Sequence, residues 1–215
     1  MFSLDAVPVL EKRIYDHEKD LKLTYYENFM SPRQSGLLFN ALEGQVKYLG
    51  EEYSVLYMGS TPVRIPRKHV AYGDDESLCY RFSKLTLPTK KWSPLLENVR
   101  DYVHKITDIK FNYCLLNQYE DGRNSIGFHA DDEAMLDPRA PIVTLSLGAT
   151  RKFVVKHVHY QKISFSLPLK SGSLLCMDPK TNEHYVHSVP KDTKVQEPRI
   201  SLTFRKILRP NEIFV

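Results

Sequence analysis

The residues best suited to chemistry are a histidine and an aspartate two positions apart, His129 and Asp131, in the stretch Gly-Phe-His-Ala-Asp-Asp-Glu. They supply one imidazole and one carboxylate at the spacing of two adjacent metal ligands. A second histidine would complete a 2-His-1-carboxylate face, which leaves positions on a divalent iron for oxygen and a co-substrate. A single His-x-Asp pair more often reflects chance or surface polarity, so the rest of the chain must supply the third ligand.

We predict that the third ligand is His187, in His-Ser-Val-Pro. It lies on a late predicted strand that a jelly roll can fold back beside His129. The pair His157 and His159 has a competing ligand spacing, but the neighbouring lysines favour a solvated strand end. The other competitor, His184, would lie on the opposite face of the strand from His187. Any one of the eight histidines is more often a hydrogen-bonded or surface residue than a ligand.

A second candidate site comes from the alternation of polar and apolar residues in the segment 199–205. Its polar face carries Arg199, Ser201, Thr203 and Arg205, and its apolar face carries Ile200, Leu202 and Phe204. Two guanidiniums that face into a barrel require carboxylate partners, because an unpaired buried charge is costly. A dicarboxylate co-substrate meets this requirement, and Asn117 and Tyr119 would add an amide and a phenol to its pocket. The alternative is a surface strand with two solvated arginines.

The elements that must position these residues are mostly strands. Strands are predicted about every ten residues at 111–119, 142–147, 152–158, 163–167, 173–177, 184–189 and 199–207. This spacing is typical of a sandwich or jelly roll. Upstream, Ser31-Pro32 and Ser93-Pro94 each begin a predicted amphipathic helix, and turn residues near Gly59 predict a hairpin. We therefore expect a mainly β fold with flanking helices (α+β), in which both helices pack outside a jelly-roll core.

The 215 residues suit one domain, for which we expect the bounds 21–209. Residues 1–20 read as an N-terminal arm that is partly disordered, and 210–215 as a C-terminal tail. Within the domain, 21–110 would provide the two helices and the hairpins, and 111–209 the jelly-roll core.

Composition excludes several classes of protein. The chain is 42% hydrophobic and 26% charged, which is typical of a soluble globular protein. No apolar run approaches the roughly 18 residues of a membrane span, and the N-terminus lacks a secretion signal. Three widely spaced cysteines indicate neither a disulfide framework nor a thiolate metal site. The net charge of +4 permits a polyanionic partner without requiring one.

Taken together, the motifs resemble those of the AlkB family of Fe(II)- and 2-oxoglutarate-dependent dioxygenases. They are Asn117-x-Tyr119, His129-x-Asp131, His187 and Arg199-x5-Arg205. The resemblance covers residues 21–209 and is strongest for the eukaryotic AlkB homologues 2 and 3, which reverse alkylation damage in nucleic acid. It implies a double-stranded β-helix that uses Fe(II), 2-oxoglutarate and O2.

The resemblance also implies a role for each site residue. The catalytic iron ligands would be His129, Asp131 and His187. In the 2-oxoglutarate pocket, Arg199 would meet the inner part of the co-substrate and Arg205 its distal carboxylate. Further contacts to 2-oxoglutarate would come from Asn117, Tyr119 and Thr203.

The family hydroxylates an N-methyl group and releases formaldehyde, while 2-oxoglutarate is decarboxylated to succinate. For this chain the resemblance implies DNA repair on bases of the 1-methyladenine and 3-methylcytosine type. The alternatives are an RNA or protein oxygenase with the same chemistry, and a non-catalytic jelly-roll binding module.

The target base must leave its duplex to reach the iron. By the resemblance, Tyr80 and Phe82 would receive the flipped base, and Asp132 and Glu133 would meet its edge. The alternatives are two ordinary core aromatics and a solvated acidic turn. A lesion-searching hairpin would include Tyr57, Met58, Gly59 and Arg67, with Arg64, Arg67 and Lys68 on phosphates.

The searching hairpin departs from the family pattern, because Met58-Gly59 stands where an aromatic wedge and its glycine are expected. The preference for duplex DNA over single-stranded DNA or RNA therefore stays open. The resemblance further implies a monomer without membrane association, located in the nucleus, with the cytoplasm as a second location.

Overall fold

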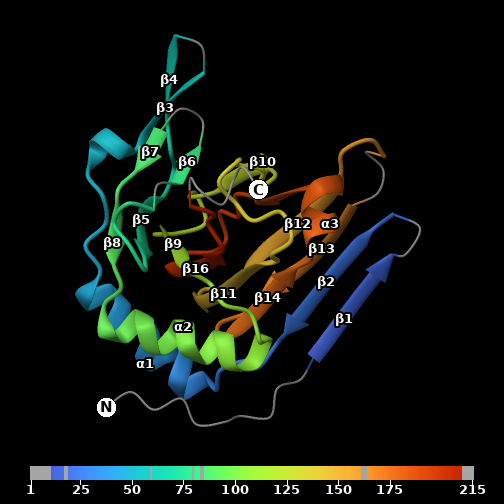
Figure 1. The fold of residues 1–215 in the computed structure, drawn as a ribbon, viewed down its shortest axis with the longest axis horizontal. Helices are drawn as coiled ribbons and strands as arrows, with labels where there is room; N and C mark the ends of the chain where they lie inside the picture. Colours follow the sequence, from blue (N-terminus) through green and yellow to red (C-terminus); the bar gives the residue numbers. More distant parts are fainter. Residues whose placement is uncertain are drawn as a thin grey trace.

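Two β-sheets that pack face to face form the centre of the protein (Figure 1). The computed structural model describes residues 11–16, 19–58, 60–78, 80–82, 85–160 and 164–209. The side chains of residues 11–13, 15, 16, 58 and 82 lie outside this description.

Among the described residues, the larger sheet has eight strands in the order β1, β2, β14, β11, β16, β9, β5 and β8. Their bounds in the same order are Glu11–Asp16, Leu21–Tyr26, Ser173–Met177, Ile142–Gly148, Arg199–Arg205, Tyr113–Tyr119, Lys68–Gly73 and Thr89–Lys91. Neighbouring strands pair antiparallel, except for β5 and β8, which are parallel.

The smaller sheet is antiparallel and has the order β10, β15, β12 and β13. Its strands span Ile126–His129, Tyr185–Val189, Arg151–His157 and Ser164–Leu169. Two hairpins lie outside both sheets, β3 with β4 and β6 with β7. Their strands span Val55–Met58, Thr61–Arg64, Tyr80–Phe82 and Leu85–Leu87. The β3–β4 hairpin projects away from the core at the top of Figure 1.

Both predicted helices are present and begin at the predicted caps. Helix α1 spans Pro32–Gln45 and α2 spans Pro94–Thr107. The hydroxyl of Ser31 accepts from the Gln34 amide, and the Gln34 side chain accepts from the Ser31 amide, which is a capping box. The hydroxyl of Ser93 accepts from the amide of Leu96 in the same way. A serine followed by proline therefore starts each helix, as the sequence predicts.

Both helices pack on the outer face of the larger sheet (Figure 1). Their buried side chains join one apolar cluster with every second residue of β16, namely Ile200, Leu202 and Phe204. The other residues of β16 line a cavity between the sheets, and these are Arg199, Ser201, Thr203 and Arg205. This division confirms the predicted alternation. The predicted mainly β fold with flanking helices and a jelly-roll core is likewise confirmed.

The structure corrects the reading of the N-terminal arm. Residues 11–16 form β1, which pairs with β2 as the edge of the larger sheet, and Ile14 packs against the cluster between the sheets. Residues 1–10 and the tail 210–215 lie outside the described residues, so both ends of the expected domain stay predictions. No helix in the described ranges is long and apolar enough to cross a membrane.

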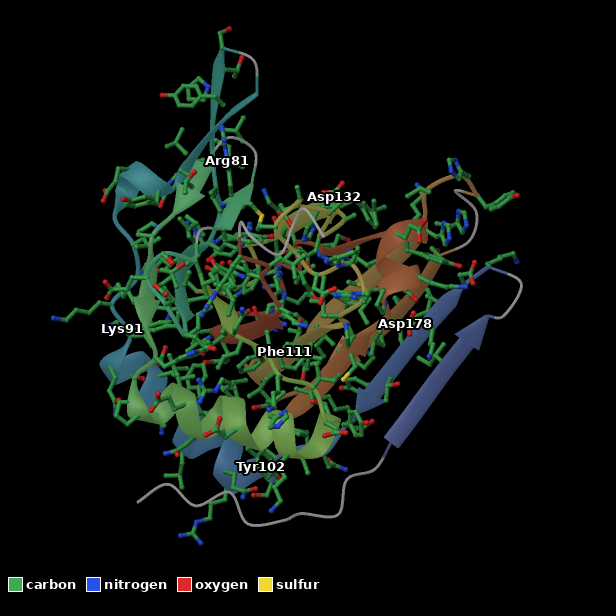
Figure 2. The ribbon with its side chains drawn as sticks, viewed as in Figure 1. Arg81, Lys91, Tyr102, Phe111, Asp132 and Asp178 are labelled. Atoms are coloured by element: carbon green, nitrogen blue, oxygen red, sulfur yellow. The ribbon has the colours of Figure 1, made fainter. Side chains whose placement is uncertain are left out.

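A short helix, α3, occupies Pro179–His184, where the sequence analysis left a loop and began a strand at 184. Asp178 caps it by accepting from the Lys180 amide, and Asp178 stands at its start in Figure 2. The Asp-Pro pair is the same cap-and-proline signal that marks α1 and α2. Thr181 anchors α3 to β2, because its hydroxyl donates to the carbonyl of Lys22 at 3.1 Å.

Candidate metal and co-substrate site

Pairing of two short strands brings the predicted metal ligands together. In the ladder between β10 and β15, His129 lies directly opposite His187, and their ring centroids are 4.2 Å apart. Asp131 follows two residues later, with its Oδ1 atom 3.9 Å from His129 Nε2. One ligand atom from each of the three residues lies within 4.8 Å of the others. The arrangement matches a 2-His-1-carboxylate metal site.

Groups outside the triad hold its members in place. The carbonyl of Gly127 accepts from His129 Nδ1 at 2.9 Å, which leaves the Nε2 lone pair for a metal ion. Asn182 on α3 binds the backbone of Asp131 twice: its Oδ1 accepts from the amide at 3.1 Å, and its Nδ2 donates to the carbonyl at 2.5 Å. The sequence analysis missed Asn182, because no local pattern links it to a residue 51 positions away.

The protonation states of the triad suit a cation. Burial lowers the pKa of His187 to about 3, helped by repulsion from His129. Burial alone would raise the pKa of Asp131, but Arg205 and the two histidines lower it to about 2. Burial also lowers the pKa of His129. At neutral pH the site therefore offers two neutral imidazoles and an ionised carboxylate, the forms that bind metals. This donor set fits Fe(II).

A cavity of about 100 Å³ extends from the triad between the sheets. Two buried arginines line it: Arg205 donates to Asp131 Oδ1 at 2.9 Å, and Arg199 donates to the Ser146 hydroxyl at 2.9 Å. For the residues that the structure describes, Nε and Nη1 of both arginines have no hydrogen-bond partner. Two buried guanidiniums with spare donors fit a dicarboxylate such as 2-oxoglutarate.

The contact between Arg205 and Asp131 favours the opposite order of the two arginines from the expected one. Arg205 contacts a metal ligand, whereas Arg199, at the start of β16, has its guanidinium 5.1 Å from the centroid of the Tyr119 ring. The expected contact of Arg205 with the distal carboxylate stays a prediction, with Arg199 as the alternative. The remaining predicted residues Asn117, Tyr119 and Thr203 do line the cavity.

Of the predicted acidic pair, only Glu133 lines the cavity. Its Oε1 accepts from the Tyr80 hydroxyl at 2.6 Å, and its buried Oε2 has no partner among the described groups. Burial raises the pKa of this carboxyl. Asp132 is exposed on the loop after β10 and does not line the cavity, and its predicted place at the base edge stays a prediction.

Tyr80 lines the cavity, as its predicted pocket position requires. It is 2% exposed, and the Cζ of Arg205 lies 4.9 Å from its ring centroid. Its hydroxyl donates to Glu133, and its predicted stacking on the base stays a prediction. The Phe82 side chain lies outside the described residues, and its predicted role stays a prediction.

The basic residues after the β3–β4 hairpin divide into two groups. Arg67 points into the cavity, where it donates to Asn117 Oδ1 at 3.0 Å, so its predicted phosphate contact is wrong. The exposed Arg64 and Lys68 pair with acidic side chains at 2.8 Å and 2.6 Å.

On the hairpin itself, Tyr57 is 63% exposed and lies outside the cavity lining. The side chain of Met58 and the whole of Gly59 fall outside the described residues. Their predicted wedge role therefore stays a prediction.

The competing histidines lie apart from the triad. His157 is 6% exposed, and its Nδ1 accepts from the amides of His159 and Tyr160. The expected solvated strand end is therefore wrong for His157. His184 is the last residue of α3, not part of a strand, and its Nε2 lies 3.7 Å from Asp20.

The jelly roll, the buried triad and the twin arginines define a non-heme iron oxygenase that uses 2-oxoglutarate. Residues 22–205 match the family model described as the 2OG-Fe(II) oxygenase superfamily. The chain belongs to this superfamily and, within it, to the AlkB family. Its cofactor is Fe(II), and 2-oxoglutarate and O2 are its co-substrates.

Three relatives illustrate the similarity. The DNA oxidative demethylase ALKBH2 of Homo sapiens is 44% identical over 178 residues, which cover 80% of this chain and 68% of the relative. The Mus musculus protein of the same name is 40% identical over 190 residues, covering 85% and 79%. The Alpha-ketoglutarate-dependent dioxygenase alkB homolog 3 of Homo sapiens is 34% identical over 154 residues, covering 66% and 52%.

A solved structure supports the fold alone. The structure of OsALKBH1 superposes with a TM-score of 0.57 at 16% identity, covering 91% of this chain and 100% of that one.

Proposed function

We propose that this chain is a DNA oxidative demethylase that repairs N-alkylated bases of the 1-methyladenine and 3-methylcytosine type. The observation that carries the proposal is one cavity holding the metal triad, two arginines with spare donors and the free carboxylate oxygen of Glu133. The relatives named DNA oxidative demethylase support DNA as the substrate. Bound Fe(II) would supply the oxygen-activating chemistry that hydroxylates the methyl group, coupled to decarboxylation of 2-oxoglutarate to succinate.

The protein's own residues bind and orient the reactants. His129, Asp131 and His187 would hold the metal, while Arg205 keeps Asp131 ionised and fixes its carboxylate. Arg199 would bind the distal carboxylate of 2-oxoglutarate, because it has spare N–H groups and Arg205 is the arginine that contacts the metal ligand Asp131. Asp131 and His187 are buried, at 4% and 8% exposed, whereas the His129 side chain is 32% exposed and would face the incoming base.

Glu133 would recognise the damaged base. One of its oxygens is held by Tyr80, and the other is free to accept from an exocyclic amino group at the base edge. N-methylation of the ring makes these bases cationic, so a nearby carboxylate favours the damaged base over the normal one. Burial raises the pKa of Glu133, and a cationic base beside the carboxyl would favour its ionised form.

The proposal is tested by incubating the protein with Fe(II), 2-oxoglutarate and oligonucleotides that carry 1-methyladenine or 3-methylcytosine. Mass spectrometry of the bases and an assay for formaldehyde should show conversion on DNA, and parallel single-stranded, duplex and RNA substrates define the preference. Asp131→Ala should abolish turnover, while Asp101→Ala on the exposed side of α2 should not. Faster conversion of methylated RNA than of every DNA substrate would contradict the assignment to DNA.

We further propose that the protein acts as a monomer in the nucleus, where its substrate would be found. Light scattering at several protein concentrations tests the first statement, and imaging of a fluorescently tagged chain tests the second. A concentration-independent dimer or exclusion from the nucleus would contradict them.

A further inference from the structure

Arg151, the first residue of β12, is a buried cation outside the metal and co-substrate contacts described above. Arg151 is 1% exposed. Nη1 donates to the carbonyl of Asp121 at 3.1 Å, and Nη2 donates to the carbonyls of Asn124 and Pro190, each at 2.8 Å. All three acceptors are neutral backbone oxygens. Among the described residues, the hydrogen bonds of Arg151 thus reach no carboxylate, and its charge is offset only at longer range, by Asp192 and Asp121.

The three carbonyls belong to the chain segments that carry the site. Asp121 and Asn124 form the turn between β9, which ends at Tyr119, and β10, which ends at His129. Pro190 directly follows β15, the strand of His187. A single guanidinium thus joins the ends of the strands that supply two metal ligands, His129 and His187, and two residues of the co-substrate pocket, Asn117 and Tyr119.

Gly122 makes a second contact between this turn and the segment after β15. The amide of Gly122 donates to the carbonyl of Val195, and its carbonyl accepts from the amide of Asp192, both at 2.8 Å. A Cβ atom at Gly122 would collide with the carbonyl of Asp192. The turn therefore lies directly on the segment after β15, and Arg151 links the same two parts of the chain through the carbonyls of Asp121, Asn124 and Pro190.

Arg151 also reaches the co-substrate pocket through an aromatic ring. Its Cζ lies over the Tyr119 ring at 5.5 Å from the centroid, and the Cζ of Arg199 lies over the same ring at 5.1 Å. Tyr119 is 3% exposed, so both guanidiniums make cation–π contacts with a ring that is shielded from water. Burial lowers the pKa of Arg199, and the charge of Arg151 lowers it further. A bound dianion would offset this repulsion.

We propose that Arg151 is a positioning residue of the 2-oxoglutarate pocket, which holds Tyr119 and the β9–β10 turn in place and adds a second positive charge behind Arg199. It acts through Tyr119 and the backbone, without touching the co-substrate. The proposal rests on the family's co-substrate and does not depend on DNA as the substrate.

The test measures binding of 2-oxoglutarate to the full chain loaded with Mn(II), which binds such sites without turnover. Isothermal titration should show a dissociation constant for 2-oxoglutarate about 10-fold higher in Arg151→Gln, the scale typical for residues that orient a metal site. Arg151→Lys keeps the charge but loses the fork that reaches three carbonyls, so its loss of affinity should be smaller. In both variants the dissociation constant for Mn(II) alone should change far less than that for 2-oxoglutarate.

The matched control is Arg123→Gln, in the same turn, because the Arg123 side chain is 81% exposed and pairs only locally with Asp121. It should bind 2-oxoglutarate like the wild type. If Arg151→Gln does not fold, Arg151→Lys decides the question, and a wild-type dissociation constant in that variant would overturn the proposal. A variant that is less stable to heat but binds 2-oxoglutarate normally would show a structural role only. Equal weakening of Mn(II) and 2-oxoglutarate would overturn the proposal as well.

Discussion

Replacing Asn182 with alanine tests whether α3 positions the metal ligand Asp131. The substitution removes both hydrogen bonds to the Asp131 backbone, at 3.1 Å and 2.5 Å, and leaves a buried amide and carbonyl without their partner. At about 1 kcal/mol for each bond, the free energy of unfolding should fall by about 2 kcal/mol. For a chain of this size that corresponds to a melting temperature lower by about 4–8 °C.

The same substitution should weaken metal binding, because Asp131 loses its fixed backbone. Partners that orient metal ligands typically contribute about 10–100-fold to affinity, so the dissociation constant for Mn(II) should rise by about 10-fold or more. Thermal unfolding and titration with Mn(II) measure the two effects separately. The control is Lys180→Ala on the same helix, whose side chain is 71% exposed. A metal affinity in Asn182→Ala equal to that of Lys180→Ala would refute the reasoning, even if the variant melted earlier.

Three further outcomes are expected. Burial and the nearby charge of Arg67 lower the pKa of His69 to about 4 from 6.5, so the unfolded state binds more protons between these values. Stability should therefore be lost as pH falls from about 6.5 to about 4, by up to about 3 kcal/mol, and urea unfolding of His69→Gln should show a shallower pH dependence. Glu133→Leu should slow repair of methylated bases while 2-oxoglutarate still binds, measured by base analysis beside titration; normal repair would remove Glu133 from base recognition. Lys68→Ala should reduce the slope of log affinity against log salt by about 1 if this exposed lysine meets a phosphate, and an unchanged slope would exclude the contact.

The parts of the site that follow from strand alternation were predictable from the sequence. In β16 every second residue faces the cavity. The period of a strand alone therefore predicts that Arg199 and Arg205 share one face and that the apolar residues share the other. The Ser-Pro caps located α1 and α2 in the same local way. The meeting of His129 with His187 required a jelly roll, which the regular strand spacing indicated before any pairing was known.

What the sequence could not predict depends on contacts between distant segments. The contact between Arg205 and Asp131 joins residues 74 positions apart, and motif order carries no such information. Asp132 and Glu133 are chemically similar neighbours, and only the path of the loop after β10 exposes one and turns the other toward Tyr80. The covered ring of Tyr80 follows from its burial under a guanidinium that lies on another strand.

A bound metal ion would stabilise the short edge strand β10. This strand is four residues long, carries an irregularity between Ile126 and His129, and is the edge of the smaller sheet with β15 as its one neighbour there. Short edge strands with broken ladders are the places where sheets fray. An ion bound by His129 and His187 would join these two strands through their side chains, opposite each other across the ladder. The ion would then stabilise the pairing of β10 with β15 at the edge of the smaller sheet. Loading with metal should therefore slow hydrogen exchange of the β10 amides more than that of the β12 amides.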